Sequence, residues 1–201
     1  MKKAFTLAEV LIALVIIGVI AAITIPIIVA DSQKQEKISR LKKVQTTLGG
    51  LILRSNVDNG PMNTWPMGGE IGDVRKDYWN VYFRPYFSDV RLCKDVYDCG
   101  YKYELSFSKW QDVSWGVMTN STRLLFILSD GTVIFYPIST TDINGNPAYV
   151  EKVYVDINGP KEPNTYCKDV FPFKRDYQKN SIVPMDCTAK FLIENWIQIV
   201  F

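Results

Sequence analysis

The chain has 201 residues, of which 47% are hydrophobic and 22% are charged, a composition typical of a folded protein. Its net charge of +2 is unevenly distributed, because residues 31–54 carry six basic and two acidic side chains. Histidine is absent, which excludes Ser-His and Cys-His catalytic pairs and every histidine-containing metal site. Acidic residues would have to supply all acid-base chemistry, and no carboxylate pair stands out by spacing, so the sequence argues against an enzyme.

The first recognisable element is a long apolar segment. Val10 to Ala30 are 21 consecutive uncharged residues, and a helix of that length just spans a hydrocarbon core of roughly 30 Å. A secretory signal peptide is the alternative, but its apolar region is shorter and ends in a small-x-small site, which residues 28–30 fit badly. Pro26 is tolerated in a membrane helix, because neighbours can satisfy the freed carbonyl. The segment therefore predicts a transmembrane helix.

A single carboxylate, Glu9, stands at the edge of this segment. A charged residue costs roughly 3 kcal/mol at the centre of a bilayer, so such a residue usually has a partner. The alternative is that Glu9 only marks the membrane boundary near Lys2 and Lys3.

Residues 2–14, with the sequence KKAFTLAEVLIAL, resemble the processing motif of type IV prepilins and of the pseudopilins of type II secretion. The resemblance implies that a dedicated aspartyl peptidase cuts between Ala4 and Phe5 and methylates the new amine. It places Glu9 at the fifth position of the mature chain, where the family keeps a glutamate. Ala4 departs from the glycine that usually precedes the cut.

This resemblance leads to a hypothesis of assembly, in which Glu9 of one subunit pairs with the Phe5 amine of its neighbour and fixes the register of a filament. The implied function is that of a structural subunit of a type II secretion pseudopilus or a related type IV pilus. Its partners would be copies of itself, other pilins, prepilin peptidase, the inner-membrane assembly platform and the lipid bilayer, with DNA a partner only of a competence pilin. The alternative is a signal-anchored periplasmic binding protein that does not assemble.

The basic residues after the span predict the opposite orientation from the motif. Five of them follow it closely, against Lys2 and Lys3 before it, so the positive-inside rule would leave the C-terminal part in the cytoplasm. We give precedence to the processing motif, which needs a cytoplasmic leader, and to four downstream cysteines, which favour an oxidising compartment. We expect a single-pass inner-membrane protein with its C-terminal domain in the periplasm or outside the cell.

An amphipathic helix follows the span and is expected to run to about Arg54. Apolar residues recur at spacings of three and four, while the other face is basic and is expected to be solvated or to meet acidic neighbours. Anionic lipid or DNA contact is the alternative for that face. The apolar positions are Ile38, Leu41, Val44, Leu48, Leu51 and Ile52.

A loop over 56–73 and a β-rich region are expected next. Asp130-Gly131 between two apolar runs is a hairpin signal, and a short helix over 188–194 leads into a strand at 196–200. The other expected strands are 102–107, 115–120, 123–129, 132–138 and 152–157. A long helix followed by an antiparallel sheet predicts an α+β fold, the pilin-like arrangement, divided into a leader (1–4), an assembly helix (5–30), an amphipathic helix (31–55) and a globular domain (56–201). Aromatic residues between 65 and 87 are expected in the core, with a sticky surface as the alternative.

Four cysteines, Cys93, Cys99, Cys167 and Cys187, allow three disulfide pairings. Proximity in the sequence favours Cys93 with Cys99 and Cys167 with Cys187. Free buried thiols are the alternative.

A calcium site is a further hypothesis. Asp156, Asn158, Asn164 and Asp169 offer several hard oxygen ligands within one loop, as calcium prefers. Some major pseudopilins are similar in carrying a calcium loop near the C-terminus. Asx-Gly pairs also make turns without metal, so a plain turn is the alternative.

Overall fold

The computed structural model describes residues 6–65, 73–102, 123–138 and 152–196, and the chain divides into two compact units, residues 1–39 and 40–201. Helix α1 (Leu7–Asn59) contributes residues to both. The other described elements all belong to the second unit. They are η1 (Met62–Thr64), α2 (Asp73–Tyr82), η2 (Arg84–Tyr86), β1 (Val90–Leu92), β2 (Arg123–Leu128), β3 (Val133–Pro137), β4 (Lys152–Asp156), β5 (Val170–Asp176), β6 (Ser181–Pro184) and α3 (Asp186–Trp196).

The first part of α1 is an apolar helix with its side chains exposed. Leu11, Ile16 and Ile23 are each more than half exposed, and Pro26 lies inside the helix without ending it. Within the described residues, α1 is the one helix long and apolar enough to cross a membrane, with a mean hydropathy of 3.1 in its most apolar window. The predicted continuation of the helix through Pro26 is confirmed.

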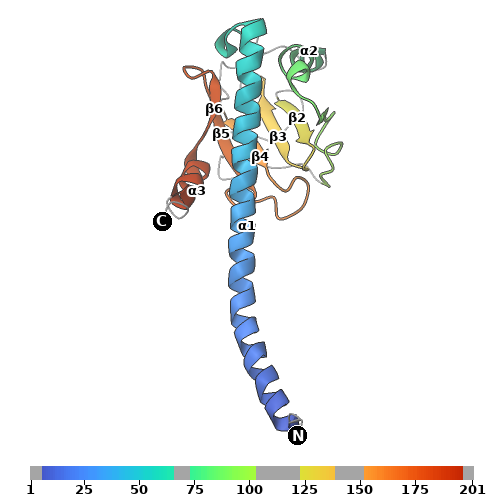
Figure 1. The fold of residues 1–201 in the computed structure, drawn as a ribbon. Coiled ribbons are helices and arrows are strands. Elements are labelled where there is room, and N and C mark those ends of the chain that lie inside the picture. The colour runs from blue at the N-terminus through green and yellow to red at the C-terminus, as the bar shows by residue number, and fades with distance from the viewer. Residues whose placement is uncertain (1–5, 66–72, 103–122, 139–151, 197–201) are drawn as a thin grey trace. The chain divides into compact units, whose positions relative to one another are not determined.

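In the described part of the second unit, the strands form a six-stranded antiparallel sheet in which they follow one another in sequence order, β1 to β6 (Figure 1). The β2–β3 connection is the predicted hairpin, in which Gly131 has a φ of 84° and its N–H donates to Leu128 O at 2.9 Å. The strand expected from Lys152 is also confirmed. With the helix that packs on this sheet, the fold class is α+β, as predicted.

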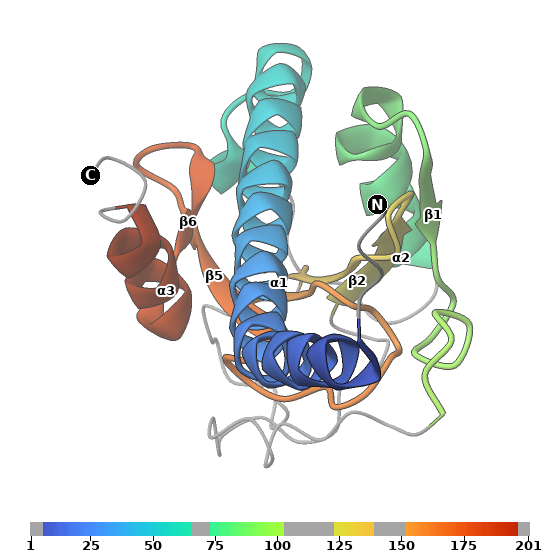
Figure 2. The same ribbon diagram turned by 60° about the horizontal axis from the view of Figure 1, so that its bottom comes forward.

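The second half of α1 buries one apolar stripe. Leu41, Val44, Leu48, Leu51 and Ile52 are all completely buried, at the spacings of three and four that the sequence analysis identified. In the second unit this part of α1 runs along one face of the sheet, with α2 and β1 on one side of it and β6 and α3 on the other (Figure 2). Each fully buried aliphatic side chain contributes roughly 1.5–3 kcal/mol, so this stripe is a major contact of the domain core.

The aromatic residues after α1 lie largely in the core, with Trp65, Tyr78, Trp79 and Phe83 buried and Tyr82, Tyr86 and Phe87 half-buried. Trp65, Trp79 and Phe83 are 3%, 6% and 0% exposed. Trp65 stacks on Tyr82 with ring centroids 4.6 Å apart, and Trp79 lies 5.3 Å from Phe126 of β2. These rings join α2 to the sheet.

Several element boundaries differ from the prediction. Helix α1 continues to Asn59, beyond the expected end near Arg54, and Asn59 Nδ2 fastens this last turn by donating to Ser55 Oγ and Tyr86 Oη. The loop expected over 56–73 therefore begins later and contains η1. The expected helix over 188–194 is confirmed within α3, and Trp196 ends that helix instead of beginning a strand. The remainder of that strand, at 197–200, and the strands expected at 102–107 and 115–120 lie outside the described residues, apart from Lys102.

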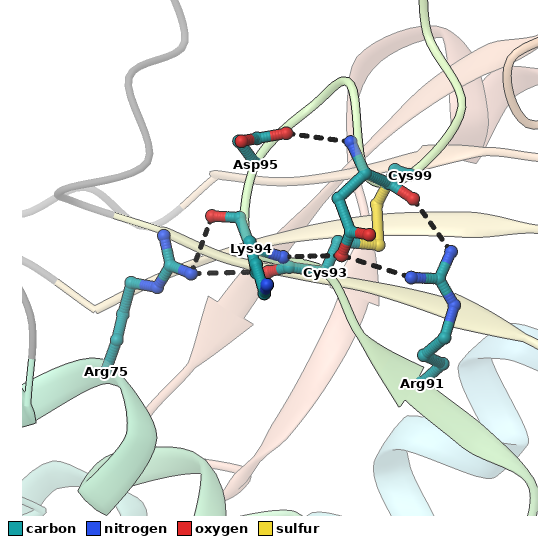
Figure 3. A network of polar contacts seen from close by, with 7 residues as sticks. Arg75, Arg91, Cys93, Lys94, Asp95 and Cys99 are labelled. Carbon is teal, nitrogen blue, oxygen red and sulfur yellow. Dashed lines mark hydrogen bonds and ion pairs between the residues drawn. A yellow bond between two sulfur atoms is a disulfide. The ribbon is translucent and has the colours of Figure 1, made fainter.

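Both disulfides form between the cysteines that are close in sequence, Cys93 with Cys99 and Cys167 with Cys187. The first closes a small loop whose main chain is held from two sides (Figure 3). Arg75 of α2 donates to the carbonyls of Cys93 and Lys94 at 3.2 and 2.9 Å, and Arg91 of β1 pairs with Asp98 at 3.1 Å. The second disulfide joins the segment before β5 to the first turn of α3.

The two disulfides are expected to differ in their contribution to stability. Loop-closure entropy predicts about 3 kcal/mol for a bridge that closes 20 residues and about 2 kcal/mol for one that closes six. Replacing Cys167 and Cys187 by serine should therefore lower the free energy of unfolding more than replacing Cys93 and Cys99. Denaturant titration of the full chain in detergent would measure both, and an equal or reversed order would contradict the expectation.

Candidate functional site

The beginning of α1 is organised by Glu9. Its Oε2 accepts hydrogen bonds from the Thr6 N–H and the Thr6 hydroxyl, both at 2.8 Å, while the Glu9 N–H donates back to Thr6 Oγ1 at 3.3 Å. This reciprocal Thr-x-x-Glu arrangement is a capping box, which satisfies main-chain donors that the first helical turn leaves unpaired. The residues of the predicted cut, Ala4 and Phe5, lie outside the described residues. Glu9 thus has a local partner in its own chain, next to the residue that would become the new N-terminus.

The β4–β5 connection, drawn in orange in Figure 1, brings together the four residues that the calcium hypothesis named. Asp156 ends β4 and is completely buried, and Asp169 precedes β5 and is 3% exposed. Asn158 Nδ2 donates to Asp169 Oδ2 at 3.3 Å, and the Asn158 N–H donates to Asp156 Oδ1 at 3.3 Å. Asn164 is 7% exposed. We call Asp156, Asn158, Asn164 and Asp169 the oxygen cluster.

Asp156 is in an unusual environment for a carboxyl group. Its pKa is raised to about 8, chiefly by burial; the nearby Asp169 also raises it, while a hydrogen bond of 2.7 Å from the Tyr101 hydroxyl to Oδ2 acts in the opposite direction. Desolvation disfavours the charged form of any buried carboxyl unless a proton or a cation compensates it. Below this pKa Asp156 is mostly protonated, so a cation that binds its carboxylate would have to displace the proton.

The Asn164 side chain completes this environment. One atom of its amide group lies 3.0 Å from Asp156 Oδ2, 3.0 Å from Gly159 O and 3.1 Å from Lys161 O. With Nδ2 in that place the amide faces three acceptors with only two hydrogens. With Oδ1 in that place, the amide oxygen would face only acceptors and Nδ2 only donors, so the orientation with Nδ2 there is the one that satisfies both amide atoms. A cation in this place would have to displace these hydrogen bonds.

A second amide oxygen in the cluster is unused by the protein. Asn158 Oδ1 is buried and accepts no hydrogen bond within the described part of the chain, although Asn158 Nδ2 donates to Lys161 O at 2.8 Å. Asp169 Oδ1 accepts a hydrogen bond from the Thr165 N–H. No three histidine, cysteine or acidic residues gather among the described residues, so any metal site here relies on amide and main-chain oxygens. Oxygen is the ligand type that calcium prefers, but the carboxylate oxygens of Asp156 and Asp169 already accept hydrogen bonds from protein donors, which a cation would have to displace.

Solvent can approach the oxygen cluster from one side. A surface pocket of about 420 Å³ has Asn164 in its wall, together with Pro160 and Lys161. Lys102 and Glu162 line the pocket as well, so charged residues of both signs border this side of the cluster.

Comparison with known proteins places the chain in a family. A model of a family of unknown function (DUF6613) matches residues 27–189, which is more than half of the chain. The chain belongs to that family. A second model, the prokaryotic N-terminal methylation motif, matches residues 1–25 and is the signature of type IV pilins and pseudopilins. No curated protein and no solved structure matches the chain.

Each of the two family models covers a different candidate site. The methylation motif contains Ala4, Phe5 and Glu9, which confirms the resemblance recognised at residues 2–14. The DUF6613 match contains the oxygen cluster and all four cysteines. This DUF6613 member therefore combines a pilin-type N-terminus with a domain that carries its own polar site.

Sequence reasoning missed part of the polar site. The carbonyl oxygens of Gly159 and Lys161, and the hydroxyl of Tyr101, all contact members of the oxygen cluster. Main-chain oxygens leave no signal in a sequence, and Tyr101 is 55 residues from its partner. The Asn158-Gly159 turn was the one available clue to the geometry.

We expect replacement of Gly159 by any residue with a Cβ to destabilise this turn. Its φ is 61°, and a Cβ there would overlap the carbonyl oxygen of Gly131 in the β2–β3 turn. Strain and overlap together predict that Gly159→Ala lowers the free energy of unfolding by about 1–3 kcal/mol. Gly131→Ala is the matched control, because its φ of 84° is also positive but a Cβ there meets nothing within 4 Å. Thermal or denaturant unfolding of both variants should show the larger loss for Gly159→Ala, and a larger loss for Gly131→Ala would contradict this packing.

Proposed function

We propose that this chain is a structural subunit of a type II secretion pseudopilus or a related type IV pilus filament, and that it acts by polymerisation and not by catalysis. One observation carries the proposal: the methylation motif at residues 1–25 includes the beginning of α1, whose apolar side chains are exposed within the first unit. An exposed apolar helix needs lipid around it, or other helices packed against it. A filament supplies these environments in turn, the bilayer before assembly and neighbouring subunits after it.

The proposal assigns a role to each segment of the chain. Residues 1–4 form the leader, prepilin peptidase cuts at Phe5, and residues 5–30 hold the precursor in the inner membrane as a single span. Residues 31–55 form the amphipathic part of the helix, and residues 56–201 form the globular domain. The two disulfides favour an oxidising compartment for that domain, either the periplasm or the exterior. The proposed partners are further copies of the chain, other pilins and the inner-membrane assembly platform.

Glu9 is the proposed assembly residue. After cleavage, the Phe5 amine of a neighbouring subunit would be attracted to the Glu9 carboxylate by roughly 4 kcal/mol at 4 Å and an effective dielectric near 20. The capping hydrogen bonds from Thr6 hold this carboxylate at the start of the helix. The contact between Glu9 and a neighbour's amine joins different surfaces of the two subunits, so it propagates into a filament instead of closing.

Mass spectrometry of the N-terminal peptide from native membranes tests the processing step. We expect a peptide that begins at N-methylated Phe5. A peptide that begins at Met1 would overturn the proposal and would favour a signal-anchored periplasmic binding protein that does not assemble.

Glu9→Ala should abolish filament formation while cleavage at Phe5 continues. The change also removes the capping box, but a lost cap costs only about 1 kcal/mol, too little to unfold a helix of 53 residues. Thr6→Ala removes the local hydrogen-bond partner of Glu9 but keeps its carboxylate, so we expect this variant to form filaments. Asp31→Ala removes an exposed acidic residue further along the same helix, and it should also form filaments. Electron microscopy of sheared filaments gives the readout, and normal filaments from Glu9→Ala would contradict the assigned role.

We further propose that the oxygen cluster binds calcium. Two observations support this proposal: the buried Asn158 Oδ1 has no donor, and three oxygens, Asp156 Oδ2 and the carbonyls of Gly159 and Lys161, all lie within 3.1 Å of one atom of the Asn164 amide. The ligands would come from Asp156, Asn158, Asn164 and Asp169, together with the carbonyls of Gly159 and Lys161. A bound cation would supply the positive charge that the buried carboxylates lack and would fix the β4–β5 connection.

Calcium should therefore raise the melting temperature of the full chain in detergent, and chelator should reverse the effect. A ligand at 100 times its dissociation constant stabilises the folded state by about 2.7 kcal/mol. Asp156→Asn should remove most of this gain, whereas Asp89→Asn, an exposed aspartate before β1, should keep it. Calorimetry that finds no heat of calcium binding, together with an unchanged melting temperature, would remove this proposal and leave the assembly proposal intact.

A further inference from the structure

The loop closed by the first disulfide, residues 93–99, is held in one conformation by its own polar groups and by a neighbouring strand (Figure 3). We call it the disulfide loop. Asp98 Oδ2 accepts a hydrogen bond from the Lys94 N–H at 2.8 Å, and the Asp98 N–H donates to Asp95 Oδ1 at 2.7 Å. Arg91 of β1 donates to the Asp98 carbonyl at 2.8 Å. Together with the disulfide, these contacts fix the main chain of the loop before any partner binds.

Tyr97 is the exception to the burial of aromatic residues in this domain. Its side chain is 54% exposed, and it is the one aromatic side chain within the described residues that is more than half exposed. The preceding Val96 is 3% exposed, and the Tyr97 carbonyl accepts a hydrogen bond from the Gly100 N–H at 2.8 Å. A tyrosine on a fixed main chain has little conformational entropy left to lose on binding, and tyrosine is enriched among the residues that dominate protein interfaces.

An apolar groove lies near the opposite edge of the sheet. Strands β1 and β6 are the two edge strands, and Figure 2 shows α2 and β1 on one side of α1, and β6 and α3 on the other. The groove has a volume of about 690 Å³, within the roughly 300–1,000 Å³ of pockets that bind ligands. We call it the α1–α3 groove. It is lined by the apolar residues Pro184, Ala189, Leu192 and Ile193 and by Lys42, Gln45 and Thr46.

The wall of this groove has the composition of a binding surface. Ile193 is 62% exposed although it is a large aliphatic residue, so a partner that covers it removes apolar surface from water. Gln45 and Thr46 supply polar side chains that can hydrogen-bond a phenolic hydroxyl, while the apolar wall suits a ring. A tyrosine side chain has both of these parts.

We infer that Tyr97 of one subunit docks in the α1–α3 groove of a second copy of the chain. The inference rests on the proposed function, because the copies meet in a filament. The disulfide loop and the groove are different surfaces near opposite edges of one sheet, so each subunit can insert its Tyr97 into one neighbour and receive that of another. Such a heterologous contact propagates along an assembly. It adds a contact between globular domains to the helix contact proposed for Glu9.

The charges of the two surfaces are complementary. The disulfide loop contains one lysine and two aspartates, a net charge of −1. Lys42 is the one charged residue among the described residues that line the groove. Opposite charge at the rim of an interface orients the partners and disfavours wrong registers. A second copy therefore fits this groove in charge as well as in polarity.

Photo-cross-linking in assembled filaments tests the contact directly. Tyr97 is replaced in the full chain by photoreactive p-benzoylphenylalanine, which keeps an aromatic ring, and this chain is co-assembled with isotope-labelled copies. After irradiation, mass spectrometry identifies the linked peptides and the label identifies the copy to which each belongs. We expect links from position 97 to residues 42–46 or 184–193 of another copy.

Variants on both sides of the contact give a second readout. Tyr97→Ala should lower the yield of sheared filaments ten-fold or more, because truncating a dominant interface residue weakens binding on that scale. Tyr97→Phe keeps the ring and should retain most of the yield. Ala189→Trp fills the groove from its wall and should reproduce the loss. Val57→Ala is the control, since Val57 is 85% exposed but belongs to neither surface.

The outcomes separate this contact from assembly itself. Tyr97→Ala should unfold at the wild-type temperature because its side chain is exposed, so its filament yield reports on docking even where Ala189→Trp does not fold. Links from position 97 to other residues or other proteins, no links at all, or a wild-type yield from Tyr97→Ala would overturn the docking while wild-type filaments still support the proposed function. Absence of filaments from the wild-type chain would overturn both.

Discussion

The burial of one apolar stripe of α1 is the interaction on which the globular domain depends. Leu41, Val44, Leu48, Leu51 and Ile52 are fully buried, and they come from a single helix that lies along the sheet. A six-stranded sheet with one uncovered apolar face would not be stable in water, since each face must be packed or polar. The helix that the proposed function assigns to assembly is therefore also the helix that completes the fold.

Because α1 is proposed to serve assembly in its first part and completes the fold with its second part, the two parts need different patterns of apolar residues. Residues 10–30 are apolar on every side, as a helix surrounded by lipid or by other helices requires. Beyond residue 40, the buried apolar side chains lie along one stripe, and residues such as Arg40, Lys43 and Arg54 make polar contacts with the sheet and its connections. The change from one pattern to the other occurs without a break in the helix, so no cap or turn residue marks it.

The sequence predicted those parts of the fold that rest on local patterns. The apolar span, the amphipathic stripe and the Asp130-Gly131 hairpin all follow from periodicity or from turn chemistry. Strand β5 was missed because Pro172 lies within it, and proline usually excludes a central strand; here it pairs with Tyr154 inside the sheet. Strand β1 has only three residues, too few for a pattern, and α2 was missed because its aromatic residues obscured the helical period.

For the candidate sites too, the sequence predicted what depends on local spacing and missed what depends on the path of the backbone. The spacing of Asp156, Asn158, Asn164 and Asp169 was enough to predict a shared loop, since all four lie within 14 residues. The carbonyls of Gly159 and Lys161 could not be predicted, because every residue has a carbonyl and only the backbone path decides which ones converge. The contacts of Arg40 were missed for a different reason. A lysine- and arginine-rich helix face normally indicates a solvated surface, and contacts over 117 residues leave no trace in spacing.

The contacts of this basic face also bear on its partners. The five basic residues after the span could have formed a patch for anionic lipid or DNA. Arg40 and Lys43 instead direct their charge to carbonyl and carboxylate groups of their own domain. Charge already satisfied within a protein contributes less to binding a polyanion, because the internal contact would have to be given up. The charges of Arg40 and Lys43 thus serve the fold, and under the proposed function the apolar residues before them are the part of α1 suited to contact other subunits.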